Sequence, residues 1–157
     1  MHVVLVNPQI APNTGNVIRL SANAGATLHL VEPLGFSLED RLLRRAGLDY
    51  HDLADVQIHP SWDAVAALFD GRVFLFTSHG QTRYDQVSFE AGDWLVFGPE
   101  STGLSADVLA TVDRSHHVVV PMRANNRSIN LATQSPSSSS RRGVNRFCGA
   151  DARFLDC

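Results

Sequence analysis

Short apolar runs recur along most of the chain and are separated by polar turns and by stretches with helical spacing. The runs are rich in β-branched and aromatic residues and are apolar throughout, which is typical of strands buried on both faces of a sheet. They predict strands at His2–Val6, Thr27–Val31, Arg72–Thr77, Trp94–Phe97 and His117–Val120.

The first predicted helix follows the polar turn Asn13–Asn16. Val17, Leu20 and Ala24 are spaced to lie on one helical face, and Gly25 is a good C-cap because glycine readily adopts a left-handed conformation. The sequence therefore predicts a strand, a polar loop and a helix in that order.

Further helices are expected between the later strands. Asp40–Ala46 is a basic stretch with helical character, and Ser61 and Ser105 can each cap the apolar segment that follows. Strands that alternate with helices predict an α/β fold, with a mostly parallel sheet flanked by helices on both faces.

Composition limits the kind of protein. A chain of 157 residues that is 44% hydrophobic is long enough for one core and too short for two ordinary domains. The net charge of −3 means that a nucleic-acid partner would be held by a local basic patch. Neither a basic leader nor an apolar span is present, so a cytoplasmic protein is expected. Cys148 and Cys157 have no ligand-like spacing and predict neither a disulfide nor a zinc site.

The amino-acid composition of the sequence changes after Thr133. Residues 1–133 form the predicted domain, whereas residues 134–157 open with a segment rich in serine, proline and arginine that cannot bury much apolar surface. We therefore treat residues 134–157 as an aberrant tail.

Three polar segments with turn residues lie where predicted strands end, which is where open parallel sheets usually bind ligands. The first, Asn7–Arg19, places Arg19 one turn into the predicted helix, where its guanidinium can bind a phosphate or can simply be solvated. The second, Phe97–Leu104, offers the Glu100 carboxylate beside two glycines that allow close backbone approach, although such turns are also common structural devices.

The third segment, Val118–Ala132, carries Ser128 and Asn130 in a polar loop after a strand. These two side chains could hold a ligand or could cap the next helix.

In this order and spacing, the three segments resemble the three conserved motifs of the SPOUT methyltransferases. The closest resemblance is to the bacterial subfamily that 2′-O-methylates the wobble nucleotide of tRNA, cytidine or uridine 34. The resemblance covers Met1 to about Thr133 and includes the runs Pro12–Phe36 and Arg41–His51.

The resemblance implies a homodimer with a C-terminal deep trefoil knot in which S-adenosylmethionine binds in a bent conformation. It places the cofactor contacts at Phe76, Gly98, Val120, Met122, Ser128 and Ile129. It assigns substrate binding and catalysis to Arg19, Glu100, Ser128 and Asn130.

Methyl transfer to a ribose hydroxyl needs an in-line approach and removal of the hydroxyl proton, and it needs no metal ion. Arg19 is the best candidate to activate the 2′-OH or to hold a neighbouring phosphate, but an arginine is too basic to accept the proton unaided. These residues do not determine which group takes the proton.

Arg41, Arg44 and Arg45 are the predicted RNA-binding patch, with an ordinary solvated helix face as the alternative. Thr102 stands where close relatives often carry an arginine, which puts one RNA or interface contact in doubt. The histidines His79, His116 and His117 are scattered and are expected to be structural or solvent-facing.

The tail can be explained by a shifted reading frame. Family members continue after the third motif with a valine-rich helix that ends in Glu-Ala-Trp-Arg-Gln. If Gln134 is CAG, each serine TCG, Pro136 CCG and the run Arg141–Asn145 AGG-CGT-GGC-GTC-AAC, reading two nucleotides later gives Val-Ala-Val-Val-Val-Val-Glu-Ala-Trp-Arg-Gln. Our hypothesis is a single-nucleotide loss near the Thr133 codon, in the gene or in its sequencing, which disrupts the knot helix.

The sequence thus predicts an S-adenosylmethionine-dependent tRNA 2′-O-methyltransferase that acts on the wobble nucleotide of leucine tRNAs. Two alternatives remain open: a SPOUT enzyme for another RNA position, and a non-catalytic RNA-binding protein of the same fold.

Overall fold

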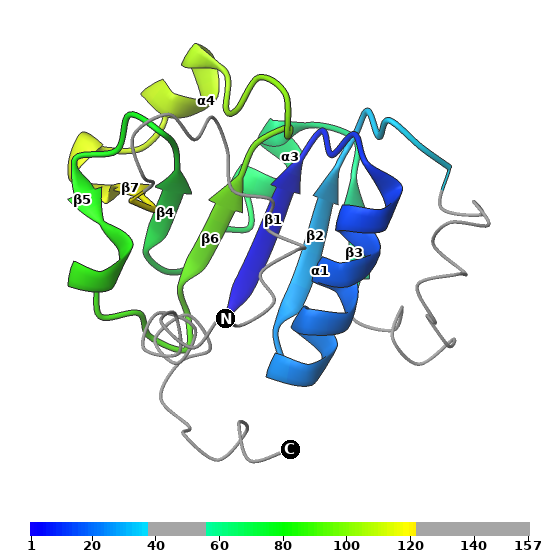
Figure 1. Cartoon of the computed structure of the whole chain (residues 1–157), viewed down its shortest axis with the longest axis horizontal. Helices are drawn as coiled ribbons and strands as arrows, with labels where there is room; N and C mark the ends of the chain where they lie inside the picture. Colours follow the sequence, from blue (N-terminus) through cyan, green and yellow to red (C-terminus); the bar gives the residue numbers. More distant parts are fainter. Residues whose placement is uncertain (38–55, 122–157) are drawn as a thin grey trace.

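A computed structural model describes residues 1–37 and 56–121, and in this part of the chain the strands form one sheet (Figure 1). Every strand pair in the sheet is parallel, and the order across it is β3-β2-β1-β6-β4-β7-β5. The strands are β1 His2–Val6, β2 Thr27–Val31, β3 Val56–His59, β4 Val73–Phe76, β5 Thr82–Arg83, β6 Trp94–Phe97 and β7 His117–Val119.

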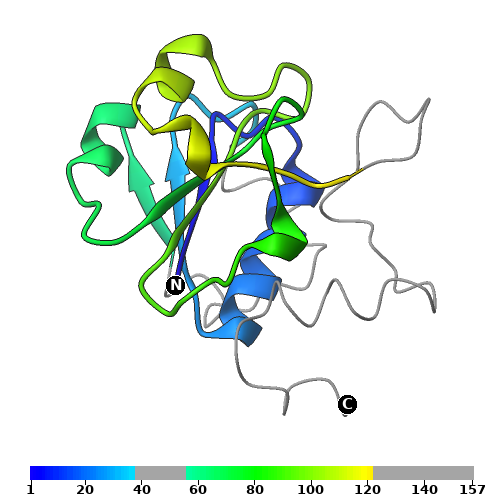
Figure 2. The same ribbon diagram turned by 90° about the vertical axis from the view of Figure 1, so that its left-hand side faces the viewer.

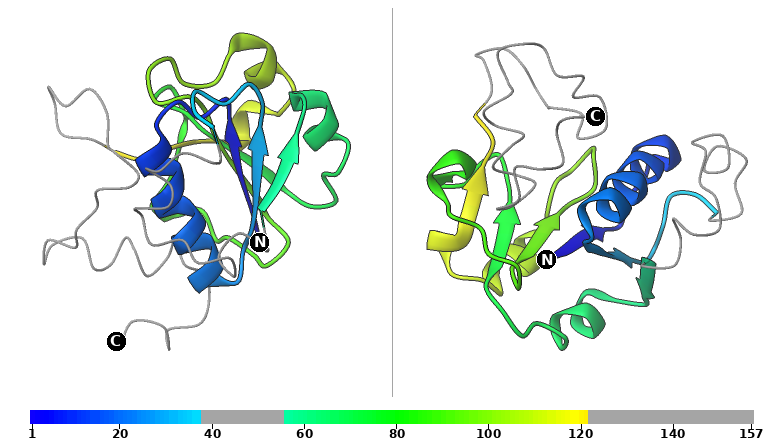
Figure 3. Two further views of the ribbon diagram at one scale, coloured as in Figure 1. Left: turned by 90° about the vertical axis from the view of Figure 1, so that its right-hand side faces the viewer. Right: turned by 90° about the horizontal axis from the view of Figure 1, so that it is seen from below.

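Helices cover both faces of the sheet, as the sequence predicts. Helix α1 (Ala11–Ala24) lies on one face and α3 (Trp62–Ala66) on the other (Figures 2 and 3), and α4 (Ala106–Ala110) packs with α3. Short 3-10 turns are formed by Tyr84–Gln86 and Arg114–His116. Within residues 1–37 and 56–121, no helix has the length and apolarity needed to cross a bilayer.

Each face of the sheet buries its own apolar layer. Alternate strand residues point to opposite faces, so Leu5 packs with α1 residues such as Ile18, while its neighbour Val4 packs with Val65 of α3 and Val108 of α4. Both layers are buried, which explains why the strands are apolar throughout.

All five predicted strands are confirmed, with ends that differ by at most a residue. Two strands were not predicted. In β3 the residues alternate in polarity and the inner pair is exposed, and β5 is only two residues long and pairs with β7 through Thr82 and Arg83. The predicted helix Asp40–Ala46, the knot and the tail lie outside the described residues.

The start of α1 corrects the sequence prediction. Residues 13–16 were expected to form a loop but lie inside the helix, which begins at Ala11 with Pro12 in its first turn. Thr14 and Gly15 are buried against the sheet, so tertiary packing overrides the turn preference of this polar run. Arg19 is consequently about two turns into the helix and not one.

The predicted helix caps are confirmed. The Ser61 hydroxyl accepts a hydrogen bond from the Ala64 amide at 3.3 Å, and the Ser105 hydroxyl accepts one from the Val108 amide at 3.3 Å. Gly25 ends α1 in the left-handed conformation, with a φ of 62°.

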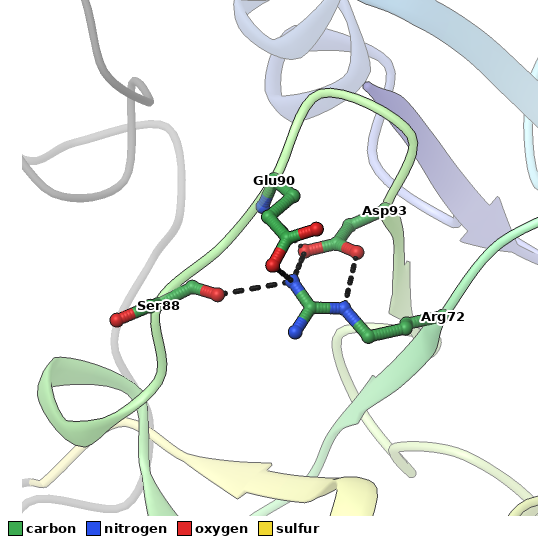
Figure 4. A network of polar contacts seen from close by, with 4 residues as sticks. All are labelled: Arg72, Ser88, Glu90 and Asp93. Carbon is green, nitrogen blue, oxygen red and sulfur yellow. Dashed lines mark hydrogen bonds and ion pairs between the residues drawn. The ribbon is translucent and has the colours of Figure 1, made fainter.

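A polar network fixes the amino ends of β4 and β6 (Figure 4). The Arg72 guanidinium forms a two-pronged interaction with the buried Asp93 carboxylate, at 2.9 and 2.8 Å, and donates to the Ser88 carbonyl at 3.0 Å. Glu90 adds an ion pair to Arg72 at 3.3 Å, but its own side chain is largely exposed. The hydrogen bond to Asp93 is the main reason that the pKa of Arg72 is raised. This network lies at the opposite edge of the sheet from the candidate site.

Candidate active site

Three of the predicted cofactor positions lie side by side at the carboxyl edge of the sheet. In the parallel register, Phe76 at the end of β4 is paired with Phe97 of β6 on one side and with Val118 of β7 on the other. Gly98 directly follows Phe97, and Val120 lies two residues beyond Val118. The sheet therefore brings together residues that are far apart in the sequence.

Gly98 begins a tight turn between β6 and α4. A Cβ atom at this position would lie 2.4 Å from the Leu104 amide nitrogen and 2.5 Å from the Gly103 carbonyl carbon, so only glycine fits. Gly103 closes the turn with a φ of 69°, and its amide donates to the Pro99 carbonyl at 2.9 Å. The turn thus leaves bare backbone at the end of β6, where a ligand can approach closely.

Phe76 can meet a cofactor only with its backbone. Its side chain is buried, and its ring is stacked on that of Phe97 with centroids 4.4 Å apart. Val120 is half-buried and packs against the same apolar layer. These strand ends present carbonyl and amide groups above an apolar floor, an arrangement that fits a nucleoside-like cofactor.

The loop after β4 is packed tightly against β7. The Thr77 amide donates to the Val118 carbonyl at 2.9 Å, and a Cβ atom at Gly80 would lie 2.5 Å from the Val118 carbonyl carbon. Gly80 is therefore required for this close approach, which keeps the loop beside the predicted cofactor positions.

Glu100 contacts the start of α1. One carboxylate oxygen accepts from the Gln9 amide at 2.9 Å, and the other accepts from the Ile10 amide at 3.3 Å and from the Asn13 side-chain amide at 3.2 Å. The Ser101 hydroxyl adds a hydrogen bond to the Gln9 side-chain oxygen at 2.6 Å. The second motif is thereby joined to the first.

Arg19 is exposed on the outer side of α1 and forms no ion pair with any described residue. It lies nine residues beyond Ile10, which is about 13 Å along the helix axis. Glu100 therefore does not contact Arg19 directly; it contacts the start of the helix that carries Arg19.

Gln9, Asn13 and Ser101 were not singled out from the sequence, although all three lie inside the first two motifs. The polar residues within each motif could have indicated a hydrogen-bonded site. The residues that pair are about 90 positions apart, however, and no local pattern predicts which of them are in contact. The remaining predicted site residues lie outside the described part of the chain: Arg41, Arg44, Arg45, Met122, Ser128, Ile129 and Asn130.

A cavity of about 580 Å³ opens on the α3 and α4 side of the same edge. It is lined in part by Val6, Glu32, Trp62, Pro99 and Leu104, and the Trp62 indole nitrogen is buried with no hydrogen-bond partner among the described residues. Phe76, Gly98 and Val120 are not in its lining, so this cavity is distinct from the predicted cofactor site. In residues 1–37 and 56–121, no group of three or more acidic, histidine or cysteine side chains is placed to hold a metal ion.

At the carboxyl edge of the parallel sheet the second motif folds back on the first, beside three adjacent strand ends suited to a cofactor. This arrangement fits the SPOUT methyltransferase class that the sequence motifs resemble. The chain belongs to the SpoU rRNA Methylase family, whose model matches residues 1–135.

Individual relatives give a narrower comparison. A tRNA (cytidine(34)-2′-O)-methyltransferase of Burkholderia ambifaria is 53% identical over an alignment of 134 residues, and the alignment covers 83% of this chain and 86% of that protein. A structure described as giving insights into 2-OH methylation of C/U34 on tRNA is 38% identical, covers 95% of this chain and 97% of its own, and superposes with a TM-score of 0.79.

The fold extends to more distant enzymes. The SpoU methyltransferase AviRb from Streptomyces viridochromogenes, solved in complex with the cofactor AdoMet, is 22% identical and has a TM-score of 0.71 over 84% of this chain and 52% of its own.

Proposed function

We propose that this protein transfers a methyl group from S-adenosylmethionine to the ribose 2′-OH of nucleotide 34 of tRNA. The observation that carries the proposal is the position of Phe76, Gly98 and Val120 at the ends of adjacent strands. From the turn that begins at Gly98, Glu100 accepts a hydrogen bond from Gln9 in the loop before α1. Membership of the SpoU family supports the cofactor, and relatives that modify tRNA nucleotide 34 support the substrate.

S-adenosylmethionine, when bound, supplies an electrophilic methyl group on a sulfonium. The residues of the chain bind and orient the two reactants. The bare turn at Gly98 and the backbone ends at Phe76 and Val120 hold the cofactor in place. Arg19 offers a planar two-pronged donor to a phosphate next to the reacting ribose, and a guanidinium has no acceptor atom for the 2′-OH proton.

The RNA is held by charge outside the catalytic residues. Arg41, Arg44 and Arg45 provide local positive charge that binds the RNA phosphates, although the net charge of the chain is negative. We propose leucine tRNAs as the substrates and the cytoplasm as the location of the protein.

A homodimer is part of the proposal. Ile10 at the start of α1 and Leu20 on its outer side are each 44% exposed, and each is an apolar side chain that a second copy of the chain can cover. Light scattering after size exclusion tests this on the chain with its reading frame restored after Thr133, and a monomer at micromolar concentration would refute it.

The function is tested by mapping 2′-O-methylation in tRNA from a strain that lacks the gene and from the same strain complemented with it. Loss of methylation at nucleotide 34 of leucine tRNAs, restored by the gene, is expected. Loss at another position would instead support a different RNA substrate. Unchanged methylation with retained tRNA binding would support the non-catalytic alternative.

A further inference from the structure

Helix α1 begins without a cap of its own. Its N-cap residue is Ile10, whose apolar side chain cannot accept a hydrogen bond, and the first turn contains no acidic residue. Pro12 in this turn has no amide hydrogen to donate. A helix start with these features leaves amide donors and a positive dipole end that another part of the chain must satisfy.

Glu100 supplies the missing acceptor from the turn after β6. Its two oxygens accept the three hydrogen bonds from Gln9, Ile10 and Asn13, and Ser101 fixes the Gln9 side chain in addition. A charged acceptor makes such bonds stronger than neutral ones.

Residues 7–10, the loop between β1 and α1 that Glu100 contacts, are also contacted from the other side by the segment after β2. The Gly35 amide donates to the Pro8 carbonyl at 2.9 Å, and a Cβ atom at Gly35 would lie 2.7 Å from the Gln9 Cα. Asn7 starts the loop in the left-handed conformation with a φ of 46°. The backbone of Gln9 is therefore fixed between Glu100 and Gly35.

We infer that Glu100 is a positioning residue, which sets the start of α1 and through the helix the place of Arg19, and that it is not the group that accepts the 2′-OH proton. Three of the about four lone-pair sites of the carboxylate already accept hydrogen bonds from Gln9, Ile10 and Asn13, and protonation of Glu100 would weaken these contacts by removing the negative charge of the acceptor. The inference rests on the proposed function for its effect on catalysis, but the contact itself does not depend on that function.

The first test measures the contact in the full-length protein. Hydrogen exchange by NMR should show the Gln9 and Ile10 amides exchanging about tenfold faster in Glu100→Ala than in the parent. Glu100→Gln, which keeps one acceptor oxygen, should lie between the two. Glu32→Gln removes the same charge at the same edge of the sheet and should leave both amides unchanged.

The second test separates positioning from proton transfer. In single-turnover assays with tRNA, Glu100→Ala should be slower by about 10- to 100-fold, because small displacements of a catalytic group have effects of this size. The dependence of the rate on pH should keep its shape, and Glu100→Gln should recover part of the rate.

Unchanged amide exchange in Glu100→Ala would overturn the inference, and so would faster exchange with an unaltered methylation rate. Equal inactivity of the Ala and Gln variants, with loss of one limb of the pH profile, would identify Glu100 as the base and would also overturn it. If the parent protein with its reading frame restored after Thr133 methylates no tRNA, the proposed function fails, while the exchange rates still decide whether Glu100 holds the loop.

Discussion

Three histidine side chains form a hydrogen-bonded row across β1, β2 and β3. The His2 Nδ1 and His29 Nε2 atoms are 3.1 Å apart, and the His29 Nδ1 and His59 Nε2 atoms are 2.9 Å apart. The His2 ring stacks on Trp94 at 4.0 Å, and the Trp94 indole donates to Asp70 at 3.0 Å. A histidine in such a row can donate one hydrogen bond and accept another only when it is neutral.

Burial disfavours the charged form of all three imidazoles. Desolvation, followed by the neighbouring His59 and His2, lowers the pKa of His29 to about 4, and burial also lowers the pKa values of His2 and His59. The unfolded chain takes up a proton on His29 near pH 6.5, whereas the folded chain does not until about pH 4. Neutral His29 therefore contributes its full stabilisation of the folded state above pH 6.5, and this contribution is lost as the pH falls towards 4.

We predict that the free energy of unfolding falls by about 2 kcal/mol between pH 7 and pH 5 through His29. His29→Phe keeps an aromatic ring beside Trp94 but cannot titrate, so it should flatten this dependence even if it lowers stability at pH 7. Urea denaturation at several pH values measures the effect. His79→Gln changes an exposed histidine and serves as the control, and an equally steep dependence in His29→Phe would contradict the prediction.

At the scale of elements, the turn between β6 and α4 decides how the candidate site is built. Gly98 allows the chain to fold back on Gly103 and Leu104, and the same turn directs Glu100 towards α1. One turn therefore serves both the predicted cofactor positions and the placement of the first motif.

Gly98→Ala should damage both roles. The added methyl group overlaps backbone atoms that have no flexible side chain to move, which costs about 1–3 kcal/mol of stability. In the chain with its reading frame restored, we also expect weaker S-adenosylmethionine binding in calorimetry, because the turn must shift at the end of β6. Gly92→Ala is the matched control, since a Cβ atom there meets nothing within 4 Å. Cofactor affinity that is equal in the two variants would argue against Gly98 as part of the cofactor site.

At the scale of the whole molecule, the family match ends at residue 135, close to the change in composition after Thr133. We propose that residues 134–145 are a frame-shifted translation of the valine-rich helix that the family resemblance implies, and these residues lie outside the described part of the chain. Replacing buried valines with serines removes roughly 1.5–3 kcal/mol of burial for each side chain. Net stability is only about 5–15 kcal/mol, so several such losses are large.

We therefore predict that the chain as written binds S-adenosylmethionine poorly and dimerises weakly or fails to fold, whereas the frame-restored chain binds and dimerises. Calorimetry and light scattering on the two proteins side by side measure this difference. Comparable affinity in both would refute the effect of the tail, and resequencing that finds an intact frame would refute its origin.

The sequence by itself determined the elements that depend on neighbouring residues. Apolar runs located the five predicted strands, and Ser61, Ser105 and Gly25 marked helix ends because a cap acts within three residues of its own position. The motif resemblance located Gly98 and Glu100 but not what they touch.

Only the tertiary structure decided the pairings between distant segments. It extended α1 back to Ala11, placed Glu100 on amides about 90 residues away and aligned the row of His2, His29 and His59. The physical reason is that strand order and register set these contacts, and they are fixed by burial of both faces of the whole sheet and not by any local periodicity.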